Sequence, residues 1–250
     1  MKYLNRPDGL RLAYHYHPAS GLNRGPTIVF LPGYASDMGG SKATALMALA
    51  EAEDRSVLLF DYAGCGASDG AFEDQSLASW RDDAIHCITQ LVQGPVLLIG
   101  SSMGGWLMLH VALAMRDRVA GLIGVAAAPD FTDWGFTQDQ KMTMLQMGRI
   151  EEENPYGPAP TITTARFWQS GEKMRLLDAP IPLHCPVTLL HGQADPDVPW
   201  EISVRLGRML ESSQVETILI KDGDHRLSRF EDIARLLAAT EWMVERICAG

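Results

Sequence analysis

The chain has 250 residues, a length that suits one large domain, and 46% of them are hydrophobic while 21% are charged. This composition is that of a globular protein and excludes intrinsic disorder, collagen and coiled coil as descriptions of the whole chain. The formal net charge of −10 disfavours nucleic acids and anionic membranes as partners, because both are bound through a basic face.

Apolar runs of strand length alternate with helical patterns along the chain. The expected strands are rich in β-branched residues and bounded by turn residues, and they lie at residue 3 and at 10–17, 27–31, 57–60, 96–99, 119–125, 187–190 and 215–220. The expected helices lie at 43–52, 77–92, 104–115, 202–210 and 233–247. Because strands that alternate with helices form βαβ units, we expect an α/β fold with a mostly parallel sheet of about eight strands and helices on both faces.

Residues 129–185 interrupt this alternation, since they contain many aromatic residues and methionines but no convincing strand. A loop longer than about 15 residues without structure of its own is uncommon in a compact domain. We therefore predict that residues 130–184, called the lid segment below, form a small helical lid inserted in a single domain that spans residues 1–250.

The cysteines and the N-terminal residues bear on the cellular location. Cys65, Cys87, Cys185 and Cys248 show no ligand spacing typical of zinc, which predicts reduced thiols and no metal site. The first residues lack the apolar core of a signal peptide and the Arg- and Ser-rich character of a transit peptide. No window is apolar enough to span a bilayer. These features favour a cytoplasmic location.

A Gly-x-Ser-x-Gly motif occupies residues 100–104, directly after an expected strand and directly before an expected helix. This setting is typical of a nucleophile elbow, in which a tight turn lifts a serine above the sheet edge. The motif predicts Ser102 as the nucleophile and places it at a helix N-terminus, whose N–H groups can stabilise a developing oxyanion. Ser101, at the variable position of the motif, is the alternative.

A nucleophilic serine needs a base, and the base needs an orienting acid. Where the serine occupies a nucleophile elbow, the acid and then the histidine follow it in the chain. His225 is the predicted base because it is the histidine that follows the last expected strand. Asp195 is the preferred acid because it lies in the first turn after the strand at 187–190, with Asp197 and Asp130 as alternatives. His191, which begins the same loop, is expected to hold that loop by hydrogen bonds.

The oxyanion of an acyl-transfer reaction needs two donors. In a fold with a nucleophile elbow, one is the N–H after the nucleophile, and the other comes from the loop after an early strand. These are the backbone N–H groups of Met103 and Tyr34, the latter after Pro32 and Gly33. A simple Pro-Gly turn is the alternative interpretation of that loop.

Taken together, the segments at 31–34, 60–70, 101–110, 122–126, 189–200 and 224–226 resemble the α/β-hydrolase family. More narrowly, they are similar to its acyl-protein thioesterases of animal mitochondria, which are also described as acyl-glucuronide esterases, and to their bacterial relatives. The resemblance implies cleavage of thioesters and oxygen esters without a cofactor. It assigns the nucleophile to Ser102, the acid to Asp195 and the base to His225, the residues that the motif and the chain order also favour.

We therefore expect a serine hydrolase that cleaves carboxylic esters or acyl thioesters of hydrophobic acyl groups through an acyl-enzyme, with a small ester or acylated molecule as its partner. A lipase or peptidase of the same fold, or a non-catalytic ligand sensor, is the alternative. Apolar residues of the chain favour binding of an acyl chain, with packing as the alternative role of those in the lid segment. The predicted substrate-binding residues are Trp134, Met142, Met144, Phe167, Trp168 and Trp200.

Overall fold

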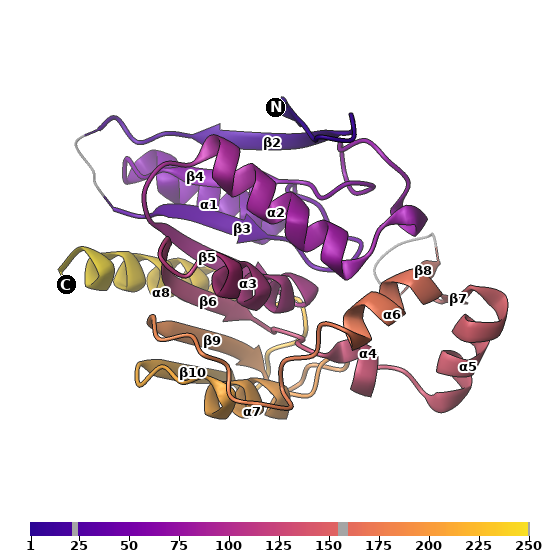
Figure 1. The fold of residues 1–250 in the computed structure, drawn as a ribbon. Helices are drawn as coiled ribbons and strands as arrows, with labels where there is room; N and C mark the ends of the chain where they lie inside the picture. Colours follow the sequence, from indigo (N-terminus) through magenta and orange to yellow (C-terminus); the bar gives the residue numbers. More distant parts are fainter. Residues whose placement is uncertain (22–24, 155–159, 250) are drawn as a thin grey trace.

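The computed structural model describes residues 1–21, 25–154 and 160–249, and its centre is an eight-stranded sheet with the order β1-β2-β4-β3-β5-β6-β9-β10 (Figure 1). The strands of this sheet are β1 (Lys2–Asn5), β2 (Arg11–His17), β3 (Thr27–Leu31), β4 (Val57–Phe60), β5 (Val96–Ser101), β6 (Val119–Val125), β9 (Val187–Gly192) and β10 (Val215–Ile220). Strand β2 pairs antiparallel with β1 and with β4, while the other pairs are parallel. The predicted fold class is thus confirmed.

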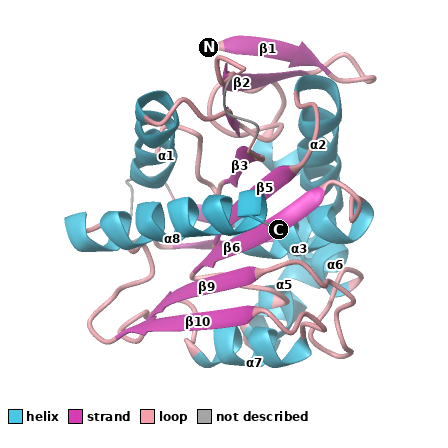
Figure 2. Cartoon of the chain, turned by 90° about the vertical axis from the view of Figure 1, so that its left-hand side faces the viewer, coloured by secondary structure: helices cyan, strands magenta, loops and turns pink. Residues whose placement is uncertain are grey.

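Helices cover both faces of the sheet, as predicted (Figure 2). One face carries α1 (Ser41–Ala52) and α8 (Phe230–Ala249), and the other carries α2 (Leu77–Leu91), α3 (Met103–Ala114) and α7 (Glu201–Met209). A 3₁₀ turn, η1 (Phe72–Asp74), precedes α2. Within the described residues, no helix has both the length and the apolar character that crossing a membrane requires.

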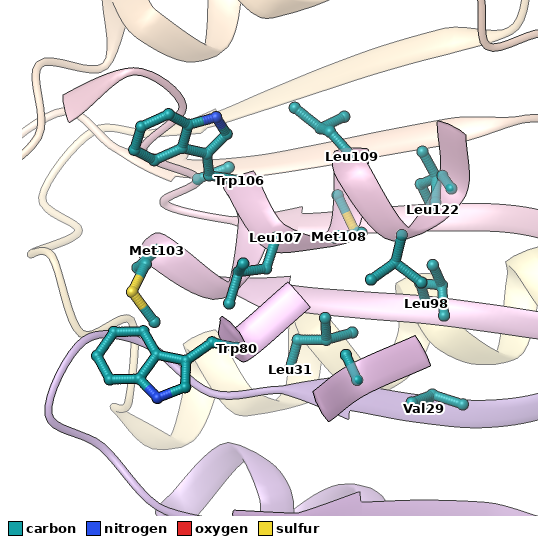
Figure 3. Close-up of a cluster of buried hydrophobic side chains, with 14 of the residues drawn as sticks. Val29, Leu31, Trp80, Leu98, Met103, Trp106, Leu107, Met108, Leu109 and Leu122 are labelled. Carbon is teal, nitrogen blue, oxygen red and sulfur yellow. The ribbon is translucent and has the colours of Figure 1, made fainter. Parts of the chain in front are cut away.

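The core consists of two apolar clusters, one on each side of the sheet. Strand β3 is buried along its whole length, and its alternate residues serve the two clusters: Val29 and Leu31 face α2 and α3, whereas Ile28 and Phe30 face α1 and α8. Figure 3 shows the first cluster, in which Trp80 of α2 and the side chains of α3 lie over the strands. Burial of each large apolar side chain stabilises the folded state by about 1.5–3 kcal/mol. The strands that lead to the Ser102 turn are therefore held in place by a well-packed core.

The lid segment follows β6, and its helices and strands lie beyond the carboxyl ends of the parallel strands (Figure 1). Its elements are α4 (Phe131–Trp134), α5 (Gln138–Met147), β7 (Arg149–Glu152), β8 (Thr161–Thr164) and α6 (Ala165–Glu172). The antiparallel pair of β7 and β8 corrects the prediction that this segment holds no strand. Both strands have only four residues and are mostly charged or hydroxyl-bearing, so they lack the apolar run on which the prediction depended.

Candidate active site

Ser102 occupies the turn between β5 and α3, with a φ of 55° and a ψ of −120°, which a residue with a side chain rarely adopts. Its N–H donates to the Val125 carbonyl at 2.9 Å, and its carbonyl accepts from the Ala128 N–H at 3.1 Å. Position 104 requires glycine, because a Cβ there would lie 2.0 Å from the Leu31 carbonyl oxygen. The motif therefore serves the close approach of α3 to β3 and holds the serine in its strained conformation.

The structure brings together the side chains of Ser102, His225 and Asp195, which come from the ends of three strands. Nε2 of His225 lies 3.0 Å from Oγ of Ser102, and Nδ1 of His225 lies 2.8 Å from Oδ2 of Asp195. An ionised carboxylate can only accept hydrogen bonds, so Nδ1 carries a proton and Nε2 of the neutral ring can accept one from the Ser102 hydroxyl. Such an arrangement can activate the hydroxyl as a nucleophile.

The Asp195 carboxylate is fully buried, with 0% of its side chain exposed. Its Oδ1 accepts the N–H groups of Asp197 and Val198, each at 2.8 Å. Burial by itself would raise the pKa of Asp195, but hydrogen bonds from His191 and His225 and the neighbouring imidazole charge hold that pKa well below its ordinary value. The carboxylate therefore stays ionised at neutral pH, where it can orient the imidazole of His225.

His191 holds the loop that carries Asp195, as predicted. The ring is buried, with Nδ1 2.7 Å from the Ser203 hydroxyl and Nε2 3.0 Å from the Val198 carbonyl oxygen. Since a carbonyl only accepts, the proton belongs on Nε2, and Nδ1 accepts from Ser203. Nε2 also lies 3.2 Å from Oδ2 of Asp195, the same oxygen that Nδ1 of His225 contacts, so both histidines hold this carboxylate.

The two alternative acids occupy different surroundings. Asp130 is buried, and its carboxylate accepts the N–H groups of Leu176 and Leu177 at 2.7 to 3.1 Å. Burial raises the pKa of Asp130 despite these bonds, and the bonds join the first residue of the lid segment to the stretch that follows α6. Asp197 is exposed and lines the cavity described below. Of the three aspartates, Asp195 is the one in hydrogen-bonding contact with Nδ1 of His225.

Asp195, Asp197 and His225 also form the group of described residues whose donor atoms a metal ion could approach, since these atoms lie within 4.8 Å of one another. The hydrogen bond between Asp195 and His225, together with the two backbone N–H groups on Oδ1 of Asp195, already uses the carboxylate of Asp195 and Nδ1 of His225. The proximity of the three side chains thus follows from the contacts of the acid with the base.

The loop of residues 32–36, which holds the predicted second oxyanion donor and is called the oxyanion loop below, lies directly against Ser102. A Cβ built on Gly33 would be 3.4 Å from Cβ of Ser102, and Gly33, Tyr34 and Ser102 all line the same cavity. Met103 is the first residue of α3. In the part of the chain that the structure describes, neither the Tyr34 nor the Met103 amide donates to a backbone carbonyl. Both amides thus lack a backbone carbonyl partner among the described residues, which is compatible with the predicted role of oxyanion donors.

A cavity of about 560 Å³ opens beside Ser102 and His225. Its walls come from the oxyanion loop, the start of α1, the β7–β8 hairpin and the histidine loop (residues 221–228). The charged residues among its lining are Asp37, Lys42, Glu152, Glu153, Asp197 and Arg226. The cavity thus has charged as well as apolar walls, and the apolar acyl pocket expected from the methionines and aromatic residues of the lid segment stays a prediction.

None of the six predicted substrate-binding residues belongs to the described lining of this cavity, so their role in substrate binding stays a prediction. Trp134 and Trp168 donate their indole N–H groups to carbonyls within and next to the lid segment, both at 3.0 Å. Met144 and Phe167 are buried, while Met142 is 51% exposed and Trp200 is the residue directly before α7. The contacts of the tryptophans and of Phe167 are those of packing, the alternative role, because a small inserted segment needs its large apolar side chains to form its own core.

Lys42 is a residue of the cavity that the sequence did not single out. It lies in the first turn of α1, and its Nζ donates to the Arg226 carbonyl next to His225. Burial lowers the pKa of Lys42 to about 8, with a further contribution from the charge of Arg226. In the sequence this lysine follows two glycines and a serine at a helix start, a pattern that carries no chemical signal of its own.

A family model described as the alpha/beta hydrolase family matches residues 28–240 of the chain. The human palmitoyl-protein thioesterase ABHD10, mitochondrial, is 36% identical over 256 residues, which cover 99% of this chain and 81% of that protein. The solved structure of mouse alpha/beta hydrolase domain-containing protein 10 is 34% identical, with a TM-score of 0.90 and coverage of 98% of both chains. A putative hydrolase from Agrobacterium vitis S4 is 33% identical, also with a TM-score of 0.90, over 98% of this chain and 97% of that one.

These comparisons confirm the resemblance inferred from the sequence and correct one expectation. The human relative and its counterparts from orangutan and cattle are named as mitochondrial proteins. The prediction of a cytoplasmic location is therefore contradicted. It depended on the cysteines, on the character of the first residues and on the lack of an apolar span, whereas the match with the human relative spans 99% of the chain.

Proposed function

The chain belongs to the alpha/beta hydrolase family, and from this premise we propose that it cleaves carboxylic esters or acyl thioesters with Ser102 as nucleophile, His225 as base and Asp195 as orienting acid. The observation that carries the proposal is the unbroken series of contacts from Oγ of Ser102 through the imidazole to the buried carboxylate, at 3.0 and 2.8 Å. The names of the mammalian relatives, which are palmitoyl-protein thioesterases, favour acyl thioesters among the substrates.

In the acylation half of the reaction, Nε2 of His225 takes the proton of the Ser102 hydroxyl as Oγ attacks the acyl carbon. Negative charge develops on the acyl oxygen, and the N–H groups of Tyr34 and Met103 stabilise it. The protonated imidazole then gives its proton to the departing oxygen or sulfur, and the acyl group stays on Oγ. Asp195 stabilises the imidazolium throughout and keeps the ring in the required tautomer.

In the second half, a water molecule takes the place of the leaving group. His225 removes its proton, the water oxygen attacks the acyl carbon, and the bond to Oγ of Ser102 breaks. The proton on Nε2 returns to Oγ, which restores the enzyme and releases a carboxylic acid. The same two amides bind the oxyanion in both halves, so each step uses one preorganised site.

A chain-length series of acyl thioesters with matched oxygen esters tests this proposal, together with labelling by a fluorophosphonate probe. The wild-type protein should hydrolyse members of the series and should be labelled on Ser102, whereas Ser102→Ala should do neither. Hydrolysis of peptide amides in preference to both ester series would instead favour a peptidase. A correctly folded protein that neither turns over any substrate nor reacts with the probe would contradict the proposal.

A further inference from the structure

Tyr34 contacts the site at one end and the lid segment at the other. Its backbone N–H lies in the oxyanion loop beside Ser102, and the residue lines the cavity. Its phenol hydroxyl donates to the Ile162 carbonyl of β8 at 2.7 Å, across 128 positions of the sequence. One residue therefore joins the loop that faces the nucleophile to the hairpin that forms the opposite wall.

The Tyr34 ring is enclosed by aromatic side chains from both parts of the molecule. Its centroid lies 5.1 Å from that of Phe72 and 5.8 Å from that of Trp80, which precede the lid segment in the chain. It lies 4.8 Å from that of Phe167 and 6.2 Å from that of Phe131, which belong to the lid segment. Burial raises the pKa of the phenol well above its ordinary value, so the hydroxyl remains a hydrogen-bond donor at every physiological pH.

The backbone of the oxyanion loop needs such support. The loop belongs to no helix or strand, and Ala35, directly after Tyr34, has a φ of 52°, which a residue with a side chain adopts only when its surroundings impose it. Within the loop, the N–H of Ser36 donates to the Gly33 carbonyl at 3.2 Å. The side chain of Tyr34, with its four ring contacts and its hydroxyl bond, is thus a principal restraint on where the Tyr34 amide points.

We propose that Tyr34 is a positioning residue whose hydrogen bond to Ile162 couples the lid segment to the oxyanion loop. The inference rests on the proposed function, since it concerns the amide that would bind the oxyanion. The bond fixes the β7–β8 hairpin, whose Glu152 and Thr161 line the cavity, and the same bond fixes the loop that carries the amide. A displacement of the hairpin therefore weakens stabilisation of the transition state as well as reshaping the cavity.

The Tyr34→Phe variant isolates this bond, because it keeps the ring contacts and the backbone amide and removes only the hydroxyl. Thr132→Val is the matched control, since it removes a hydrogen bond inside the lid segment, from Oγ1 of Thr132 to Glu172 at 2.7 Å, without touching Tyr34. For each variant, kcat and KM are measured with one thioester and one oxygen ester. Affinity is measured for an alkyl boronic acid, which forms a tetrahedral adduct with the serine, and for the free carboxylic acid product.

For Tyr34→Phe we expect kcat and boronate affinity to fall together by about fivefold, the equivalent of about 1 kcal/mol for one neutral hydrogen bond. Affinity for the product acid should stay within about twofold of wild type, and Thr132→Val should leave all three quantities within about twofold, a change below about 0.5 kcal/mol. A Tyr34→Phe protein with unchanged kcat and boronate affinity, or with a loss confined to KM, would overturn the inference.

A second variant guards against misfolding of the first. Phe167→Leu weakens the ring contact from the lid segment, and Phe167 does not belong to the described lining of the cavity, yet the coupling predicts that its kcat and boronate affinity also fall. Urea unfolding and circular dichroism show which variants are folded. Wild-type activity and probe labelling of Ser102 report on the proposed function separately, so an active wild type with an unaltered Tyr34→Phe rejects the coupling alone.

Discussion

Gly192 and Gly223 touch backbone to backbone: a Cβ on Gly192 would lie 2.1 Å from the carbonyl oxygen of Gly223. The first ends β9 and leads into the loop of Asp195, while the second lies in the histidine loop that carries His225. The N–H of Ala194 donates to the same Gly223 carbonyl at 3.0 Å. The loops after the neighbouring strands β9 and β10 can therefore approach closely, because no side chain lies between them, and Asp195 and His225 come into contact.

Replacing Gly192 by alanine should therefore separate the two loops. A contact of 2.1 Å with backbone cannot be relieved by rotating a side chain, so we expect the free energy of unfolding to fall by about 1–3 kcal/mol and kcat to fall at least tenfold. Urea unfolding and steady-state kinetics measure the two effects. Gly207→Ala in α7 is the control, because its Cβ would meet its nearest atom, Oγ1 of Thr217, at an ordinary 3.4 Å. Near-wild-type kinetics for Gly192→Ala would contradict this account.

The pair of serines in the elbow allows a direct test of the nucleophile. Ser102→Ala should lower kcat by about 10⁴-fold or more, by analogy with measured serine–histidine–aspartate triads. Ser101→Ala should change kcat little, because Ser101 ends β5 and is buried, with no contact to His225 among the bonds of the described residues. Single-turnover and steady-state rates are measured on both proteins. Equal losses in the two variants would refute the assignment of Ser102.

Three aspartates are candidates for the orienting acid, and replacing each by asparagine distinguishes between them. Asp195→Asn should lower kcat about 10⁴-fold, because an amide at this position favours the wrong imidazole tautomer. Asp197→Asn should keep most of the activity, since its side chain is exposed. Asp130→Asn should lower stability through the lost charge-assisted bonds to Leu176 and Leu177, with kcat per folded molecule nearly unchanged. A larger kcat loss in Asp197→Asn than in Asp195→Asn would transfer the role to Asp197.

His110 gives the fold a dependence on pH that is separate from catalysis. Burial lowers the pKa of His110 from 6.5 to about 4. The hydrogen bond to the Met174 carbonyl acts in the opposite direction, and the charge of Arg81 lowers the pKa a little further. The unfolded chain therefore binds more protons than the folded one between these pH values, so stability falls as the pH drops from 6.5 towards 4, by on the order of 3 kcal/mol.

The variant His110→Gln keeps an N–H donor for Met174 and removes the titration. Urea unfolding at pH 7.5, 6 and 4.5 should show a shallower loss of stability in this variant than in the wild-type protein, with the two curves parallel above pH 7. A variant whose stability falls with acidification as steeply as that of the wild type would show that His110 does not cause the dependence.

The order of the strands and helices and the place of the serine turn could be predicted from the sequence alone. Runs such as residues 28–31 are continuously apolar because both faces of a central strand are buried. Residues 100–104 carry glycines because the helix meets the strand closely. Burial of a strand and tightness of a turn each constrain only a few consecutive residues, so both can be recognised in a short stretch of sequence. The chain order of Ser102, Asp195 and His225 is likewise a property of the sequence, as is the β-branched character of the strands that precede them.

Only the tertiary structure decided what surrounds the serine. The β7–β8 hairpin is too short and too polar to be recognised locally, and it reaches the cavity because Tyr34, Phe167 and their neighbours dock the lid segment there. Nζ of Lys42 reaches the carbonyl of Arg226 in the histidine loop, and α1, which carries Lys42, packs against α8. Contacts of this kind join residues more than a hundred positions apart. The free energy of such a contact depends on how well the two surfaces fit, and no single stretch of sequence contains both surfaces.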